Sequence, residues 1–128
     1  MELILDTNAL SAAAEGEAGV AVLLSKADQI LIPVIVLGEF RFGISQSRNR
    51  AQYERWLTEI LQTCLVLEIS DATTYHYASI RGELKRAGTP IPTNDLWIAA
   101  LCRQHRAPLL TSDRHFDRIA GLNRIPTD

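Results

Sequence analysis

Short apolar runs alternate with helical patterns along the whole chain, and this alternation limits the fold more than any other feature of the sequence. Residues 2–5, 29–32, 64–69 and 109–111 are expected strands, and 124–126 are expected to add a fifth strand at an edge. Alternating strands and helices predict a parallel sheet covered on both faces. We therefore expect an α/β fold of three layers, in which helices flank a central parallel sheet of four to five strands.

Helical patterns fill the stretches between these runs. Thr7 or Asn8 can cap a helix after the first strand, and further helices are expected over residues 20–27, 34–42, 47–62, 70–87, 95–105 and 113–119. Apolar residues recur at helical spacing most clearly in 47–62, which predicts an amphipathic helix. Pro33 is expected in the first turn of the third helix, Gly43 near the end of that helix, and Gly88 after the fifth. Because 95–105 is apolar nearly all round, we expect it at the centre of the fold.

The composition suits one domain over residues 1–128. The chain has 128 residues, of which 47% are apolar, so it can bury a core without disulfides. Cys64 and Cys102 lie far apart and lack the spacing of a zinc site, which predicts buried thiols in a reduced compartment. We find neither a secretion signal nor an apolar stretch of membrane-spanning length. These features predict a cytoplasmic protein.

Four acidic residues stand where a parallel α/β fold would expose them at one end of its sheet: Asp6, Glu39, Asp95 and Asp113. Asp6 closes the first apolar run and Asp113 follows the fourth, at the edge where open α/β sheets bind ligands. Carboxylates crowded together repel one another unless a cation neutralises them. An oxygen-rich site suits Mg²⁺ or Mn²⁺. The pattern therefore predicts metal-assisted hydrolysis of a phosphodiester.

Three of the four acids also have a purely structural interpretation, and Glu39 is the exception, because a metal ion would supply the partner that its charge needs. Asp6, Asp95 and Asp113 are equally well explained, one at a time, as helix caps or first-turn acids. Glu39 interrupts an apolar run, where a buried charge without a partner would cost several kcal/mol or so. Asp117 follows Asp113 by four residues, so on a helix starting at Asp113 it would face the same way, as an accessory ligand or as a surface acid.

The net charge, the histidines and the tryptophans limit the possible functions only a little. The formal net charge of −2 argues against a broad positive field for nucleic acid, although an RNA substrate stays possible. The three histidines, including His115, share no spacing with a Ser or Cys nucleophile. Trp56 and Trp97 fall on apolar helical faces, which favours a place in the core over base stacking.

Four motifs in register resemble those of PIN-domain ribonucleases, and within them the toxins of VapBC-type toxin–antitoxin pairs. The motifs are Asp6-Thr7-Asn8, Gly38-Glu39-Phe40, Asn94-Asp95-Leu96-Trp97-Ile98-Ala99-Ala100 and Thr111-Ser112-Asp113-Arg114-His115-Phe116. Their order, their spacing and the total length agree with the family, so the resemblance spans essentially the whole chain. It implies a three-layer PIN-like fold, with the acids meeting at the carboxyl edge of the sheet.

The resemblance also implies an activity and partners. The protein would be an endoribonuclease toxin in which the four acids bind one or two Mg²⁺ or Mn²⁺ ions. Asn8, Thr111 and Asp117 would be supporting residues. The family is generally dimeric, and a small antitoxin holds such toxins inactive by covering the acidic pocket with its carboxyl-terminal segment. We expect the groove for that segment in the helical region from Val34 to Leu61.

Other classes fit less well. A solitary PIN-type RNA-processing nuclease is the nearest alternative. A Mg²⁺-binding receiver-like signalling domain would need an acid pair after the first strand and a lysine after the last, and neither is present. A haloacid-dehalogenase-like phosphatase would need an aspartate where Asn8 stands. A non-catalytic binding module remains open, and RNA binding without cleavage would identify it.

Overall fold

The computed structural model describes residues 1–128 and contains one five-stranded parallel sheet. The strands are β1 (Glu2–Leu5), β2 (Gln29–Pro33), β3 (Leu65–Leu67), β4 (Leu109–Leu110) and β5 (Arg124–Ile125). Their order across the sheet is β3-β2-β1-β4-β5, and every neighbouring pair is parallel. The five expected strands are therefore present, and the last one lies at an edge as predicted.

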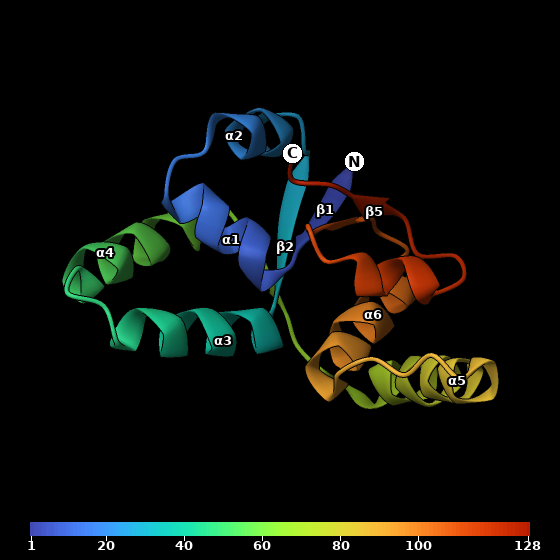
Figure 1. The fold of residues 1–128 in the computed structure, drawn as a ribbon. Helices are drawn as coiled ribbons and strands as arrows, with labels where there is room; N and C mark the ends of the chain where they lie inside the picture. Colours follow the sequence, from blue (N-terminus) through green and yellow to red (C-terminus); the bar gives the residue numbers. More distant parts are fainter.

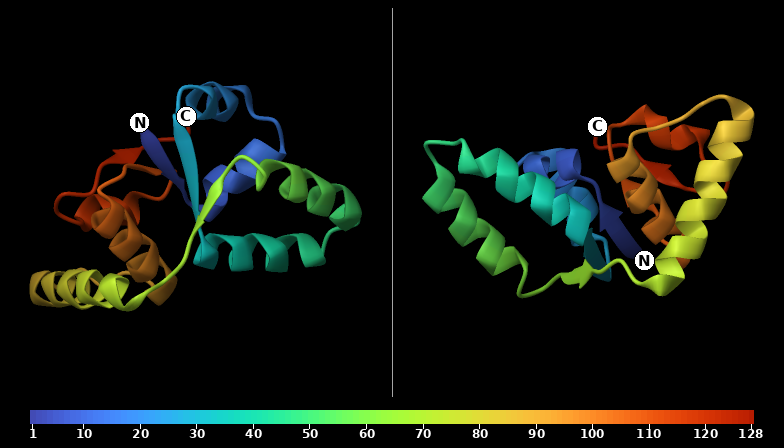
Figure 2. Two further views of the ribbon diagram at one scale, coloured as in Figure 1. Left: turned by 180° about the vertical axis from the view of Figure 1, so that it is seen from behind. Right: turned by 90° about the horizontal axis from the view of Figure 1, so that it is seen from below.

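Six α-helices and one 3₁₀ helix connect the strands. They are α1 (Thr7–Ala14), α2 (Ala18–Ser25), α3 (Val34–Ser45), α4 (Arg50–Ile60), α5 (Asp71–Ala87), α6 (Thr93–His105) and the 3₁₀ helix η1 (Arg114–Arg118). Helices α1 to α4 lie on one side of strands β1 and β2, and α5 and α6 lie on the other (Figures 1 and 2). The expected three-layer α/β fold is confirmed.

The core lies around the central strands and α6. Leu3, Ile4 and Leu5 of β1 are fully buried, as are both residues of β4. Successive residues of a strand point to opposite faces, so a strand without exposed side chains must be covered on both faces. In α6 the run from Ile98 to Cys102 is buried, which confirms the central position expected for this helix. No helix is long and apolar enough to cross a membrane.

Three helix boundaries were predicted from the sequence, at Pro33, Gly43 and Gly88. The first two differ from the prediction and the third agrees with it. Pro33 ends β2 with an extended backbone and does not begin the next helix. Helix α3 continues past Gly43 to Ser45, because Gly43 keeps an ordinary helical φ and Ile44 is buried beyond it. Gly88, in contrast, has φ +71° and ends α5 as predicted.

The order of the strands creates a topological switch point next to β1. The chain proceeds outward from β1 to β2 and β3, then returns to the other side of β1 for β4 and β5. The direction of winding therefore reverses between β1 and β4. In open α/β sheets, ligands bind outside the carboxyl ends of the strands at such a reversal. Asp6 follows β1 directly at this point, and Thr111 follows β4.

Candidate metal and nuclease site

The four predicted acids come from four different parts of the fold. Asp6 follows β1, Asp113 lies in the loop after β4, Asp95 is the third residue of α6, and Glu39 lies in the second turn of α3. The charges of the other three acids all raise the pKa of Asp95. The structure therefore brings the four acids together.

Asp6 is buried and is held by three hydrogen bonds. Its Oδ1 accepts a 2.8 Å hydrogen bond from the backbone N–H of Thr7, so Asp6, not Thr7 or Asn8, caps α1. Its Oδ2 accepts from the Thr111 hydroxyl at 2.7 Å and from Asn8 Nδ2 at 3.2 Å. Burial would otherwise make this carboxylate costly, and the donors offset that cost.

Asn8 and Thr111 connect the two loops that carry Asp6 and Asp113. Asn8 Nδ2 donates to the Thr111 hydroxyl at 3.0 Å, and Asn8 Oδ1 accepts from the backbone N–H of Ser112 at 3.0 Å. The Thr111 hydroxyl also accepts from the backbone N–H of Asp113 at 3.0 Å. The two predicted supporting residues therefore fix the ends of β1 and β4 relative to each other.

Glu39 is half-buried and has a hydrogen-bond partner. The Thr7 hydroxyl donates to Glu39 Oε1 at 2.8 Å. The sequence predicted a more buried carboxylate, because the residues around it are apolar. On α3, however, the buried side chains form one stripe and Glu39 lies beside it, facing α1. Thr7 thereby orients an acid that comes from a separate element.

Asp95 and Asp113 lie next to His115. The Nδ1 atom of His115 is 3.0 Å from one Asp113 oxygen, 3.2 Å from the other and 3.6 Å from Asp95 Oδ2. One ligand atom from each of these three residues lies within 4.8 Å of the others. Asp113 also caps η1, because its Oδ1 accepts from the backbone N–H of His115 at 2.9 Å.

Two of the four carboxyl groups, those of Asp6 and Asp95, have a raised pKa and so bind a proton more tightly than a free carboxyl group. Burial, and then the charges of Asp6 and Asp113, raise the pKa of Asp95 from 3.8 to about 6. Burial also raises the pKa of Asp6, against the hydrogen bonds from Thr111 and Thr7, which lower it. No lysine or arginine forms an ion pair with any of the four acids. The site therefore has an excess of negative charge.

Asp117, unlike the four acids, forms an ion pair with an arginine. Its two carboxylate oxygens accept hydrogen bonds from Arg124 at 2.8 and 3.1 Å, and this interaction lowers its pKa. Residues 114–118 form a 3₁₀ helix, in which residues four apart do not share a face. The sequence argument assumed an α-helix beginning at Asp113. The supporting role of Asp117 stays a prediction, and its partner here is Arg124.

Two residues that contact the acids, Thr7 and His115, were not predicted from the sequence as site residues. Thr7 was considered only as a helix cap, and its contact with Glu39 depends on the packing of α1 against α3. His115 was judged only by its spacing to other histidines and to nucleophiles. The sequence signal that could have found His115 is its position two residues after Asp113. When Asp113 caps the turn, its carboxylate accepts from the backbone N–H of His115, which keeps the two residues in contact.

The two cysteines and two tryptophans lie partly as expected. Cys64 and Cys102 are buried free thiols, and burial raises the pKa of both. Trp56 packs against the core and contacts Phe40. Trp97 is half-buried and stacks on Tyr77, with ring centroids 4.0 Å apart. The two thiols are thus buried as expected, whereas the two indole rings are only half-buried.

Comparison with known proteins agrees with this geometry. A family model described as PIN domain matches residues 3–122. Ribonuclease VapC2 of Rickettsia felis is 35% identical over 101 residues, which are 78% of this chain and 75% of that protein. Two solved structures share the fold. VapBC2 from Rickettsia felis bound to a promoter DNA fragment has a TM-score of 0.88 at 31% identity, covering 100% of both chains. VapBC-1 from nontypeable Haemophilus influenzae has a TM-score of 0.85 at 27% identity, covering 99% of this chain and 98% of that one.

This chain belongs to the PIN-domain family and, within that family, to the VapC ribonucleases. The family membership confirms the resemblance inferred from the four motifs. It leaves the signalling-domain and phosphatase alternatives without support.

Proposed function

We propose that this protein is a metal-dependent endoribonuclease that acts as the toxin of a toxin–antitoxin pair, with residues 1–128 as one nuclease domain. The observation that carries the proposal is the meeting of four carboxylates at the reversal of strand order, with no lysine or arginine paired to them. The names of the relatives, which include ribonucleases of VapBC systems, support the substrate class and the biological role.

The donor set fits a hard divalent cation. Asp6, Glu39, Asp95 and Asp113 would hold Mg²⁺ or Mn²⁺, and the carboxylate oxygens they offer are the ligands such ions prefer. The ligand atoms of Asp95, Asp113 and His115 already lie within 4.8 Å of one another. When bound, the ion would lower the pKa of a water molecule and stabilise charge on the leaving oxygen.

The protein's own residues would orient the reacting groups. Thr111 and Asn8 fix the Asp6 carboxylate, and Thr7 fixes Glu39, so two of the four acids are held in place by hydrogen bonds within the fold. At neutral pH Asp95 is mostly ionised, because its pKa is about 6, and its carboxylate can orient the attacking water. Such preorganised geometry is a large part of catalysis of phosphoryl transfer.

An antitoxin segment would reach the acids through a groove between α1, α3 and α4. This groove has a volume of about 280 Å³, and Glu39 lies in it together with Phe40, Gly43, Ile44 and Tyr53. These residues fall within the region from Val34 to Leu61 expected from the sequence. A basic side chain carried by the partner would pair with the acids and compete with the metal ion. We also propose a homodimer, as the resemblance to the PIN-domain family implies.

RNA cleavage tests the proposal. Purified protein is incubated with a structured RNA pool and Mg²⁺ or Mn²⁺, beside EDTA and the variants Asp6→Asn and Asp95→Asn. We expect metal-dependent cutting that falls at least about a hundredfold in both variants, consistent with removing a group that acts on the transition state. Glu59→Gln, an exposed acid of α4 without an ion pair, is the matched control and should cut like the wild type. Cutting that persists in EDTA or in Asp95→Asn would contradict the proposal.

A further inference from the structure

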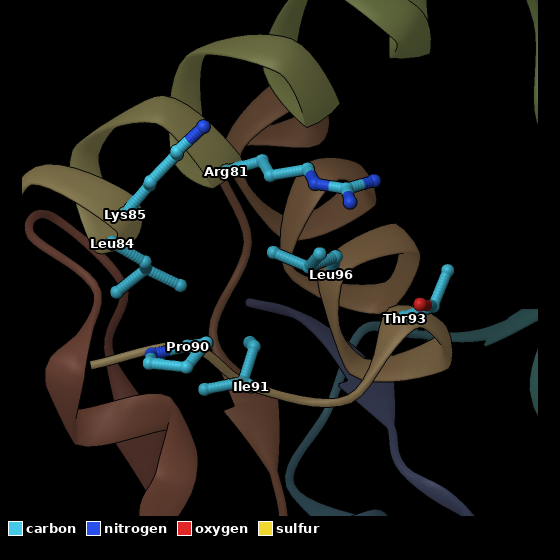
Figure 3. Close-up of a pocket in the computed structure, with 7 residues that line it drawn as sticks. All are labelled: Arg81, Leu84, Lys85, Pro90, Ile91, Thr93 and Leu96. Carbon is cyan, nitrogen blue, oxygen red and sulfur yellow. The ribbon is translucent and has the colours of Figure 1, made fainter. Parts of the chain in front are cut away.

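A pocket at the start of α6, the helix that carries Asp95, is lined by two basic side chains that the proposed mechanism does not use. It lies between α5, the linker of residues 88–92 and the start of α6, and its volume is about 380 Å³. Figure 3 shows its lining, which consists of Arg81, Leu84 and Lys85 from α5, Pro90 and Ile91 from the linker, and Thr93 and Leu96 from α6. Pockets of this size that combine apolar walls with a few polar groups commonly bind small ligands or parts of larger ones.

The two basic side chains are not neutralised within the protein. Neither Arg81 nor Lys85 forms an ion pair, whereas three other arginines of the chain pair with carboxylates. Arg81 Nη1 donates one hydrogen bond, of 2.8 Å, to the Tyr77 hydroxyl, and its guanidinium carbon lies 5.9 Å from the centre of that ring. A guanidinium has five N–H donors, so most remain free. The contact holds Arg81 in place without cancelling its charge.

The rest of the pocket lining is mainly apolar and well supported. Leu84, Ile91 and Leu96 are buried and belong to the core. The Arg118 side chain donates to the carbonyl of Pro90 at 3.1 Å, which ties the linker to η1. Two cationic side chains next to buried apolar ones match the two parts of a nucleotide, since arginine binds phosphate oxygens and a base can pack one face against apolar side chains.

The pocket and the acidic site share the start of α6. Thr93 stands two residues before Asp95 and Leu96 one residue after it, and both line the pocket. Consecutive Cα atoms are about 3.8 Å apart, so the pocket begins within a few ångströms of the helix segment that carries an acid of the site. Thr93 and Leu96 are three residues apart and share one face of α6, so an RNA strand that crosses the start of this helix would contact the pocket and the acidic site in turn.

We propose that this pocket binds one nucleotide of the RNA strand next to the scissile phosphate. Arg81 and Lys85 would bind a phosphate of that nucleotide, and Leu84, Ile91 and Leu96 would contact its base. This inference rests on the proposed function, because it assumes that the substrate is RNA. It assigns a substrate-positioning role to residues that, apart from Leu96, lie outside the four family motifs.

Binding of RNA under conditions without cleavage tests the phosphate contacts. All proteins carry Asp95→Asn, and a fluorescent, random-sequence single-stranded RNA is titrated at several KCl concentrations. Arg81→Gln/Lys85→Gln should bind at least about tenfold more weakly, and the slope of log K against log salt should fall by about 0.7 for each phosphate that the variant no longer binds. The control Lys26→Gln/Arg55→Gln removes the same two charges from exposed sites at the end of α2 and on α4.

The RNA affinities and salt slopes of the two double variants are compared with each other. A weaker affinity and a smaller salt slope in Arg81→Gln/Lys85→Gln alone would support the inference. Equal affinities and equal slopes in the two double variants would overturn it, because any weakening would then reflect net charge and not this pocket.

Cleavage of modified RNAs tests the base contact. A set of substrates carries one abasic nucleotide, moved step by step across the cleaved bond. One position beside the bond should lower kcat/KM of the otherwise unchanged protein at least about tenfold, as stacking of one base would require. Arg81→Gln/Lys85→Gln should lose that sensitivity, and equal sensitivity in both proteins would overturn the inference. If the unmodified protein cuts no RNA with either metal, the proposed function fails, and the binding comparison alone decides the inference.

Discussion

At the scale of single residues, the hydrogen bonds of Asp6 are compatible with both roles that the sequence offered as alternatives. One of its oxygens caps α1, and the other receives hydrogen bonds from Thr111 and Asn8 within the acidic cluster. A capping interpretation and a metal-ligand interpretation are therefore compatible for the same carboxylate. Asp95 differs, because it caps no helix and has only His115 as a close partner. Replacing Asp95 consequently separates activity from stability better than replacing Asp6.

Thr111 tests how strongly the hydrogen-bond network holds the site. Its buried hydroxyl contacts Asp6, Asn8 and the backbone of Asp113. Thr111→Val keeps the shape but leaves buried polar groups unpaired, so we expect a loss of about 1–3 kcal/mol in the free energy of unfolding. Denaturant unfolding measures it, with Thr111→Ser as the control that keeps the hydroxyl. A valine variant as stable as the wild type would show that the network contributes nothing.

Asp95 makes the stability of the metal-free protein depend on pH. Its pKa is about 6 in the folded protein and 3.8 when unperturbed, so the folded state binds the proton more tightly. Stability contributed by this group is therefore present at low pH and is lost as the pH rises from 3.8 to about 6. Asp95→Asn in EDTA should melt above the wild type by at least about 4 °C at neutral pH, or roughly 1 kcal/mol.

Melting curves in EDTA across this pH range provide the check. The difference in Tm between Asp95→Asn and the wild type should grow up to about pH 6 and then stay constant, because Asp95 is ionised in both states above its pKa. A difference that does not vary with pH, or that favours the wild type, would contradict the assignment of this pKa.

At the scale of elements, the sequence predicted strands and helices well and their ends less well. The runs in β1 and β4 were identifiable because nearly all their residues are apolar, as burial on both faces of a sheet requires. The ends depend on backbone angles that the residue type alone does not determine. Gly88 adopts a positive φ and ends α5, whereas Gly43 keeps a helical φ and α3 continues through it. Tertiary packing decided between these outcomes.

Two glycines of the same chain allow this difference to be measured. A Cβ added at Gly88 or at Gly38 would meet no atom within 4 Å, so only the backbone differs. Gly88→Ala places alanine at φ +71° and should lower the free energy of unfolding by about 1–2 kcal/mol. Gly38→Ala, inside α3, should raise it by up to about 1 kcal/mol. Thermal unfolding of the two variants should show opposite signs, and the same sign would refute the argument.

The groove between α1, α3 and α4 can be blocked from α3 itself. Gly43 lines this groove, and its Cβ position is open. Gly43→Leu should therefore keep the fold, fill the groove, and weaken binding of the cognate antitoxin at least about tenfold, because the bulky side chain occupies the partner's place. Gly43→Ala is the control with a smaller side chain. Unchanged antitoxin affinity for Gly43→Leu in a calorimetric titration would place the segment elsewhere.

At the scale of the whole molecule, the topology of the sheet brings distant residues together. Asp6 and Asp113 are far apart in the sequence but follow adjacent strands, and the sequence predicted their meeting because parallel strands end at one edge. The contacts of Thr7 with Glu39 and of His115 with Asp95 were not predictable in this way. They depend on how α1, α3 and α6 pack, which no local pattern records.

The central claim is that the four acids form the metal site of a ribonuclease, and a Mn²⁺ titration tests it most directly. Binding is measured by calorimetry on the metal-free protein, and RNA cleavage is measured over the same Mn²⁺ concentrations, for the wild type and for Asp95→Asn/Asp113→Asn. We predict that Mn²⁺ binds the wild type, that half-saturation coincides with half-maximal cleavage, and that the double variant neither binds Mn²⁺ nor cuts RNA while remaining folded. Undiminished Mn²⁺ binding by the double variant, or cleavage by the wild type without metal, would contradict the account.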